Sequence, residues 1–128
     1  MPIVETNWVP IRAEIIFINH SPALGKEIPE YHPLLVASPK RFNEQTGFVI
    51  GFPMTHADFH SDNPMAKTIT CRAKTLGVMV PSYVLGFQPK SFDWRARNAK
   101  RHAWGVGYEQ ELEDMLNIFD SICRLPEI

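Results

Sequence analysis

The residues with the clearest chemical potential combine positive charge with aromatic rings near position 100. Cationic side chains attract phosphate groups and aromatic rings stack on nucleobases, so this mixture is typical of a surface that binds single-stranded nucleic acid. The alternative is a solvated charged face without a ligand. The cluster consists of Trp94, Arg95, Arg97, Lys100, Arg101, His102 and Trp104.

A second group, His56, Asp58, His60 and Asp62, invites a metal-binding interpretation. Two histidines at this spacing share a face only on a helix, and the polar stretch 56–63 predicts a loop instead. No second cluster of metal ligands accompanies the group. The sequence therefore favours a loop beside a binding groove and predicts no metal site.

The charge of the chain is almost balanced overall but unevenly distributed. The net charge is −1. Of the 13 basic and 14 acidic residues, one and six lie within 108–128, so the rest of the chain holds 12 basic and 8 acidic residues. A basic body with an acidic C-terminal segment can still present a face that attracts phosphate.

Length and composition predict a single globular domain over residues 1–128. A chain of 128 residues with 45% hydrophobic residues can bury one core. The chain lacks an apolar run long enough for a membrane span and the basic start of a secretory signal, so we expect a cytoplasmic protein with no membrane contact. Cys71 and Cys123 are too few for a disulfide framework and are expected as buried thiols.

Short apolar or alternating segments, separated by turn residues, predict five to seven strands. A helical turn or tight turn ending at Gly47 is expected between two of them, and Trp8 and Val9 of an N-terminal extension, residues 1–12, are expected to cover an edge of the core. The strand segments are 13–19, 34–38, 48–54, 67–72, 76–80 and 83–87.

Near the C-terminus the apolar residues recur with the period of a helix. They predict an amphipathic helix over 108–124, which Pro126 stops. Strands followed by one helix indicate a mainly β fold, a small barrel-like antiparallel sheet with a C-terminal helix packed on it. The apolar face consists of Leu112, Met115, Leu116, Phe119, Ile122 and Cys123.

Four segments resemble, in the same order, the motifs of the MazF/PemK (Kid-like) toxin family. The resemblance covers about residues 13–124. The segments are the apolar strand from Ile15 through Pro22 to Gly25-Lys26-Glu27; His32-Pro33 through Ser38-Pro39; Asn43 through Thr46-Gly47 to Pro53-Met54-Thr55; and Gln88-Pro89-Lys90-Ser91 through Trp94-Arg95-Ala96-Arg97.

This resemblance implies an SH3-like or CcdB-like barrel and a symmetric homodimer. It also implies a type II toxin–antitoxin toxin, an mRNA interferase that cleaves single-stranded RNA without a metal or other cofactor. The partner is a cognate antitoxin that occupies the RNA groove, and DNA is contacted only through that antitoxin.

Metal-free RNA cleavage needs a base for the ribose 2′-OH, an acid for the leaving 5′-oxygen and positive charge near the phosphorus. The family uses an arginine of its Arg-Pro motif and the threonine of Pro-x-Thr, which correspond here to His32 and Thr55. An imidazole can both accept and donate a proton near neutral pH, so the resemblance implies that His32 is the acid and base. Thr55 is then a ligand of the phosphate or the 2′-OH.

The resemblance assigns substrate binding to six further residues. Lys26 supplies charge and Glu27 orders its loop; the others are Gln88, Lys90, Arg95 and Arg97. Structural roles remain open: His32 as a strand-start residue that hydrogen-bonds a loop, Thr55 as an ordinary strand-end hydroxyl and Glu27 as a solvated acid.

At the two positions where Kid-like members have a further Arg and Asp, this chain has Leu85 and Phe87. This departure favours an alternative function, a non-catalytic protein of the same fold that binds an antitoxin, DNA or another protein through an apolar groove lined by these two residues. A CcdB-like gyrase poison is a third alternative, but that family depends on a Trp-Gly-Ile terminus and this chain ends in Leu125-Pro126-Glu127-Ile128.

Overall fold

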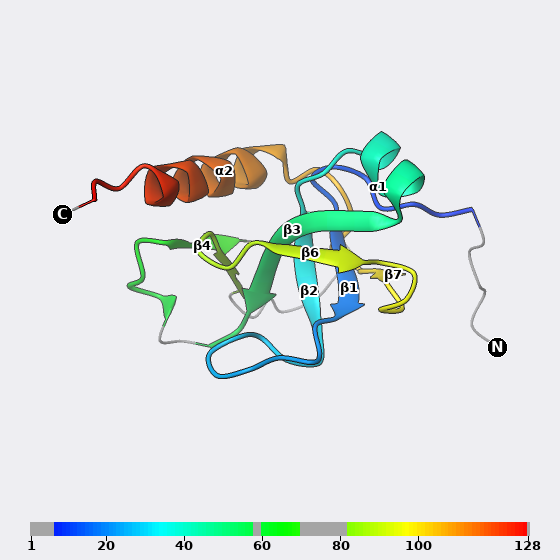
Figure 1. Ribbon diagram of the computed structural model, residues 1–128, viewed down its shortest axis with the longest axis horizontal. Coiled ribbons are helices and arrows are strands. Elements are labelled where there is room, and N and C mark those ends of the chain that lie inside the picture. Colours follow the sequence, from blue (N-terminus) through cyan, green and yellow to red (C-terminus); the bar gives the residue numbers. More distant parts are fainter. Residues whose placement is uncertain (1–6, 58–59, 70–81, 128) are drawn as a thin grey trace.

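The chain folds into an antiparallel sheet with two helices (Figure 1). The computed structural model describes residues 7–57, 60–69 and 82–127, and within these ranges the sheet has seven strands. The elements are β1 Ile15–Asn19, β2 Tyr31–Val36, α1 Lys40–Thr46, β3 Phe48–Thr55, β4 Ala66–Ile69, β5 Ser82–Leu85, β6 Lys90–Asp93, β7 Lys100–Arg101 and α2 Glu109–Cys123.

Strand β3 organises the sheet because it pairs with three other strands. β2 lies along one edge of β3, whereas β6 pairs with residues 48–51 and β5 with Met54 and Thr55 on the other. β3 bends between these partners, as its curved ribbon in Figure 1 shows. The order β4-β5-β3-β2-β1-β7, with β6 also on β3, gives the barrel-like sheet that the sequence predicted.

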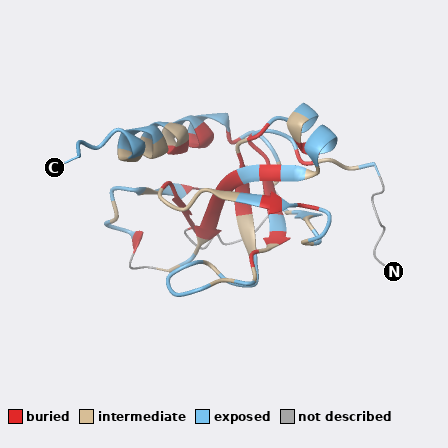
Figure 2. Cartoon of the chain, viewed as in Figure 1, coloured by how far each residue is buried: buried red, intermediate tan, exposed pale blue. Residues whose placement is uncertain are grey.

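Helix α2 covers one face of the sheet and closes the larger part of the core. Leu112 and Met115 are buried against strand residues such as Phe52 and Met54, and Figure 2 shows the buried residues of α2 in its first half. The helix approaches closely, since a Cβ added at Gly86 would lie 2.6 Å from Cγ2 of Ile118.

The opposite face of the sheet carries a second core. It consists of Ile16, Ile18, Leu34, Val36, Val49, Phe92 and Trp94. Trp8 and Val9 pack against it, which confirms that the N-terminal extension covers an edge of the core. The candidate residue His32 lies on this face, two residues before Leu34 on β2.

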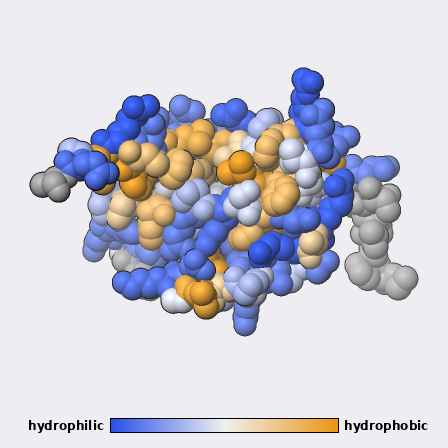
Figure 3. Space-filling view, in the orientation of Figure 1, coloured by the Kyte–Doolittle hydropathy of each residue, from blue (hydrophilic) through white to orange (hydrophobic). Residues whose placement is uncertain are grey.

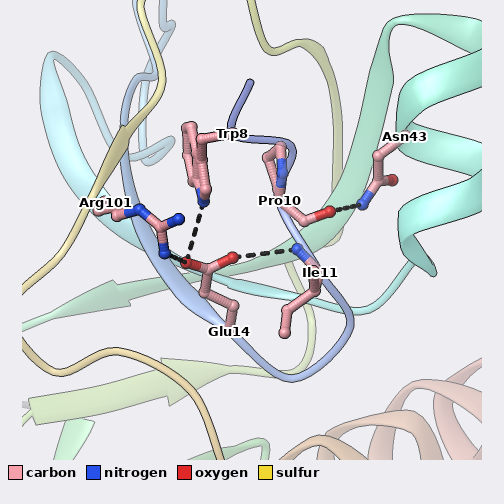
Figure 4. A network of polar contacts seen from close by, with 6 residues as sticks. All are labelled: Trp8, Pro10, Ile11, Glu14, Asn43 and Arg101. Atoms are coloured by element: carbon pink, nitrogen blue, oxygen red, sulfur yellow. Dashed lines mark hydrogen bonds and ion pairs between the residues drawn. The ribbon is translucent and has the colours of Figure 1, made fainter. Parts of the chain in front are cut away.

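Two buried polar side chains fasten the N-terminal segment to the sheet (Figure 4). The Glu14 carboxylate accepts hydrogen bonds from Nε1 of Trp8 at 3.3 Å and from the Ile11 N–H at 3.0 Å. Nδ2 of Asn43, in α1, donates to the Pro10 carbonyl at 2.8 Å. Such bonds hold residues 8–11 in place because a buried polar group left unpaired is costly.

The element boundaries follow the sequence prediction with instructive exceptions. α1 ends at the left-handed Gly47, and α2 spans all but the outermost residues of the predicted helix. β2 begins at Tyr31 rather than Leu34, because Pro33 pairs with Phe17 of β1 although proline is unusual inside a sheet. The predicted strand 76–80 and residues 70–72 of another lie outside the described residues.

Two short strands and one cysteine differ from expectation. β6 and β7 were not predicted as strands, since four and two residues are too few to show a period. Cys123 is exposed rather than buried, since the buried residues of α2 lie in its first half and Cys123 is its last residue; Cys71 lies outside the described residues. Among the helices of the described residues, none has the length and apolar character that a membrane crossing needs.

Replacement of Gly51 by alanine should destabilise the sheet. An added Cβ would lie 2.4 Å from the Leu35 carbonyl oxygen and 2.9 Å from Cγ of Leu34. Because β3 is paired on both edges at Gly51, the backbone cannot move away. We expect Gly51→Ala to lower the free energy of unfolding by about 2 kcal/mol. Urea unfolding measures this loss, with Ser91→Ala, an exposed substitution on β6, as the control. A Gly51→Ala midpoint equal to that of wild type would contradict the close approach of Gly51 to β2.

Candidate active site

The sheet brings His32 and Thr55 to the same end of neighbouring strands. The β2–β3 register pairs Leu34 with Pro53. His32 and Thr55 lie two residues beyond this last pair, His32 near the start of β2 and Thr55 at the end of β3. Because side chains alternate along each strand, His32 is on the face of Leu34 and Thr55 on the face of Pro53. The candidate acid/base and the candidate phosphate ligand, far apart in sequence, therefore lie at the same end of the sheet.

Hydrogen bonding fixes which nitrogen of His32 can take part in proton transfer. Nδ1 lies 2.6 Å from the Pro29 carbonyl oxygen. A carbonyl only accepts, so Nδ1 carries the hydrogen and Nε2 of the neutral ring carries the lone pair. Nε2 makes no hydrogen bond to the described part of the chain. The loop contact predicted for a structural histidine is present, and this contact also orients the imidazole ring.

The Thr55 hydroxyl is also oriented by the backbone. Its Oγ1 accepts a hydrogen bond from the Ala57 N–H at 3.2 Å. The acceptor side of the oxygen is thereby engaged, which leaves the hydroxyl hydrogen for donation to another group. A half-buried Thr55 at the end of β3 can thus donate to a phosphate oxygen or to a ribose hydroxyl.

Residues 20–30 form a loop that carries the candidate residues Lys26 and Glu27. This loop is hydrogen-bonded to the segment that precedes β6. The Glu27 carboxylate accepts from the Leu24 N–H at 2.9 Å, so Glu27 orders the loop. Nε2 of Gln88 donates to the Lys26 carbonyl at 3.4 Å and joins this loop to the β5–β6 connection. Lys26 is exposed, and Lys90 begins β6 opposite Gly51.

The two candidate arginines have different surroundings. Nη1 of Arg97 donates to the carbonyls of Asn19 at 3.2 Å and Ser21 at 2.7 Å, so Arg97 anchors the start of the loop. Its guanidinium also lies over Phe92, 4.3 Å from the ring centroid. Arg95 instead lies over Trp94 at 4.1 Å, next to the turn after α1. Asp93 pairs with Phe48, so Arg95 is at the opposite end of β3 from Thr55.

The cationic residues of the cluster predicted from the sequence do not form one patch, because each lies over a different aromatic ring. Lys100 lies over Tyr31 and Arg101 over Trp8, each 5.6 Å from the ring centroid. His102 packs its ring on Phe17 at 4.6 Å. Within the described residues, Arg97 is the member of the cluster that hydrogen-bonds the start of the loop carrying Lys26 and Glu27.

His20 belongs to the site although the motifs did not single it out. Its side chain is 2% exposed and follows Ile16 and Ile18 on the same face of β1. Nε2 lies 3.2 Å from the His32 carbonyl oxygen. The pKa of His20 is lowered to about 4, chiefly by burial; the hydrogen bond to the His32 carbonyl raises it, and the charges of His32, Lys90 and Arg97 lower it. The period-two continuation of β1 into Asn19-His20 was the signal available in the sequence.

This buried imidazole makes folding stability depend on pH. The unfolded chain protonates His20 near its ordinary pKa of 6.5, whereas the folded chain does so only at about 4. The stabilisation is therefore complete above pH 6.5 and is lost as pH falls towards 4, by up to about 3 kcal/mol. Urea unfolding between about pH 7 and about pH 4.5 should show a smaller loss for His20→Phe than for wild type. Equal losses would contradict this assignment.

The two residues at the Kid-like motif positions do not form an apolar groove together. Leu85 is fully buried in β5, so the prediction that it lines a groove is wrong. Phe87 is half-buried and packs on the ring of His60, with centroids 6.1 Å apart. The prediction assumed that one face of this strand is open, whereas all four residues of β5 are buried.

The histidines of the 56–63 loop have structural partners. Nδ1 of His56 lies 3.1 Å from Oγ of Ser82, and Nδ1 of His60 lies 3.3 Å from Nδ2 of Asn63. Asp58 lies outside the described residues. Across residues 7–57, 60–69 and 82–127, no three His, Cys, Asp or Glu side chains gather as a metal site would require.

Comparison with known proteins agrees with the motifs. Residues 11–120 match the family described as PemK-like, MazF-like toxin of type II toxin–antitoxin system. The endoribonuclease toxin MazF of Escherichia coli (strain K12) is 27% identical over 96 residues, which cover 75% of this chain and 79% of that protein.

Solved structures show the same fold. MazF (Form-I) from Deinococcus radiodurans superposes with a TM-score of 0.77 at 24% identity, over 93% of this chain and 100% of that one. A MazE–MazF structure (Form-III) from the same organism gives a TM-score of 0.68 at 26% identity, with the same coverage. The chain therefore belongs to the family of PemK-like, MazF-like toxins of type II toxin–antitoxin systems.

Proposed function

We propose that this toxin is an endoribonuclease that cleaves single-stranded RNA without a metal ion, with His32 as acid and base. The observation that carries the proposal is the Nδ1 contact to the Pro29 carbonyl, which leaves the lone pair of His32 on Nε2, at the end of the sheet where Thr55 lies. The relative from Escherichia coli is itself an endoribonuclease toxin. Histidine in place of the motif arginine supplies a group that exchanges protons near neutral pH.

In the proposed reaction Nε2 of His32 removes the proton of the ribose 2′-OH. The 2′-oxygen bonds to the adjacent phosphorus, and the bond from phosphorus to the 5′-oxygen breaks. The protonated His32 then returns the proton to the leaving 5′-oxygen, so the products are a 2′,3′-cyclic phosphate and a 5′-hydroxyl. Charge that develops on the phosphate oxygens is stabilised by the Thr55 hydroxyl and the nearby Lys90.

The remaining predicted ligands take supporting roles in this proposal. Lys26 attracts the RNA backbone from the exposed loop that Glu27 orders. Gln88 fixes that loop against the start of β6, and Arg97 fixes its first residues. Arg95 lies too far along β3 for the same phosphate and would contact RNA beyond the cleavage site.

A homodimer and a cognate antitoxin are the proposed partners. Phe48 and Ile50 of β3 are 44% and 39% exposed, and Figure 3 shows apolar residues gathered over α2 and β3 on one face. Exposed apolar patches mark surfaces that bind other proteins. Solved relatives include MazE–MazF structures and an endoribonuclease in complex with its cognate antitoxin. DNA would be contacted through the antitoxin, and action on mRNA places the toxin in the cytoplasm.

The test is incubation of the purified protein with a long single-stranded RNA in EDTA. Wild type should cut at a few discrete positions, and Thr55→Ala should cut the same positions about 10²-fold more slowly, since it loses one donor to the phosphate. Thr68→Ala, an exposed threonine on β4, is the matched control and should cut as wild type. Intact RNA with folded wild type would refute the nuclease and leave a protein-binding toxin fold.

A further inference from the structure

We propose that His20 is a positioning residue for His32, which it holds through a hydrogen bond and a ring contact. The inference rests on the proposed nuclease function. It concerns the side chain next to the acid/base and assigns no proton transfer to His20 itself. Four observations on the described residues support it.

The hydrogen bond runs from the His20 ring to the backbone of the residue it positions. Nε2 lies 3.2 Å from the His32 carbonyl oxygen. Since the carbonyl is an acceptor, Nε2 of His20 is the protonated nitrogen. The backbone N–H of His20 also donates a hydrogen bond to the Glu30 carbonyl at 2.7 Å. His20 therefore binds both the end of the 20–30 loop, through its backbone, and the start of β2, through its ring.

Ring packing determines the orientation of His20. Its ring meets Phe92 edge-on, with centroids 5.1 Å apart at 83°, and meets the His32 ring at 6.1 Å and 88°. With 2% of its side chain exposed, the His20 ring is enclosed by closely packed neighbours, Phe92 among them. His32 therefore lies against a fixed surface.

The surroundings of His20 keep it uncharged. Three cationic or titratable groups face it: His32 on β2, Lys90 on β6 and Arg97 in the turn that follows. Its Nδ1 is buried without a hydrogen-bond partner in the described chain, as a neutral ring with its hydrogen on Nε2 allows. A neutral ring is the form that positions His32 without adding a charge that would oppose protonation of His32 during the reaction.

Together these contacts define the direction of the reactive nitrogen of His32. Pro29 binds its Nδ1 from the loop and His20 binds its carbonyl from β1, so the backbone and the ring are held from two sides. Partners that orient a metal-bound histidine typically change activity 10–100-fold when mutated, and we expect an effect of this size for the contact of His20 with His32. The expected loss falls on the chemical step rather than on RNA binding.

The experiment compares His20→Phe with His20→Gln in the full-length protein. Phenylalanine keeps the ring against Phe92 but has no donor, whereas Nε2 of glutamine can still donate to the His32 carbonyl. We expect His20→Phe to lower kcat about 30-fold with KM within about twofold, and His20→Gln to recover most of kcat. Thr68→Ala, at the exposed threonine on β4, is the control and should leave both constants unchanged.

A second readout does not depend on RNA cleavage. The imidazole NMR signals of His32 should shift in His20→Phe, because the Nδ1 hydrogen bond to Pro29 loosens, and should return towards wild type in His20→Gln. If wild type cleaves no RNA, the proposed function fails alone and this shift still tests the positioning. Unchanged His32 signals, or equal loss in both variants, would overturn it. If His20→Phe does not fold, His20→Met carries the same test.

Discussion

Replacement of His32 by alanine should lower kcat/KM for RNA cleavage by about 10³-fold. The reason lies in the geometry of β2, where Pro29 binds Nδ1 and leaves Nε2 as the base. Alanine removes both the proton acceptor for the 2′-OH and the proton donor for the 5′-oxygen. Cleavage of a fluorogenic single-stranded RNA in EDTA, with excess enzyme to isolate the chemical step, measures the loss.

A further variant separates proton transfer from charge at this position. His32→Arg restores the residue type of the family motif, but a guanidinium keeps its proton and cannot act as the base, so this variant should keep the positive charge and still cleave much more slowly than wild type. Thr68→Ala, at the exposed threonine on β4, is the control and should cleave as wild type does. Full activity of His32→Ala at any pH would contradict the assigned role.

Replacement of Asn43 by aspartate should destabilise the fold by about 4 kcal/mol. Asn43 is fully buried, and its Nδ2 donates to the carbonyls of Pro10 at 2.8 Å and Ser38 at 3.0 Å. An aspartate of the same shape has no hydrogens to donate and would face two carbonyl oxygens with a buried charge. The N-terminal segment drawn in Figure 4 would lose its attachment to α1.

Urea unfolding with an invariant m-value tests this expectation. Asn43→Ala should lose about 3 kcal/mol, less than the aspartate, because it leaves unpaired carbonyls but buries no charge. Glu44→Ala, the exposed neighbour on α1, is the control and should unfold as wild type does. An aspartate variant as stable as the control would show that the network contributes little.

The long periodic segments of the fold were predictable from sequence because each shows its burial pattern over several residues. α2 followed from apolar residues such as Leu112 and Met115 at helical spacing, and β3 from a continuous apolar run. β6 and β7 were missed because their pairing depends on partners distant in sequence. The start of β2 was predicted three residues too late, because proline is unusual inside a strand and the sequence does not show that Pro33 pairs with Phe17.

The candidate site was predictable in its residues but not in their arrangement. His32 and Thr55 were found by motif, whereas their approach depends on the β2–β3 register. His20 was missed because its importance comes from a contact with the His32 backbone, which no motif encodes. The loop roles of Glu27 and Arg97 likewise depend on carbonyl and N–H groups that any residue supplies.

The central step of the proposed mechanism is cleavage of the bond between phosphorus and the 5′-oxygen by attack of the neighbouring 2′-oxygen. The most direct test is an RNA whose mapped cleavage site carries a single 2′-deoxy nucleotide, compared with the all-ribose RNA in EDTA. We predict no cleavage at the deoxy site, and a 2′,3′-cyclic phosphate with a 5′-hydroxyl on the products of the ribose RNA. Cleavage at the deoxy site, or products with a 5′-phosphate, would contradict the mechanism and the role of His32 with it.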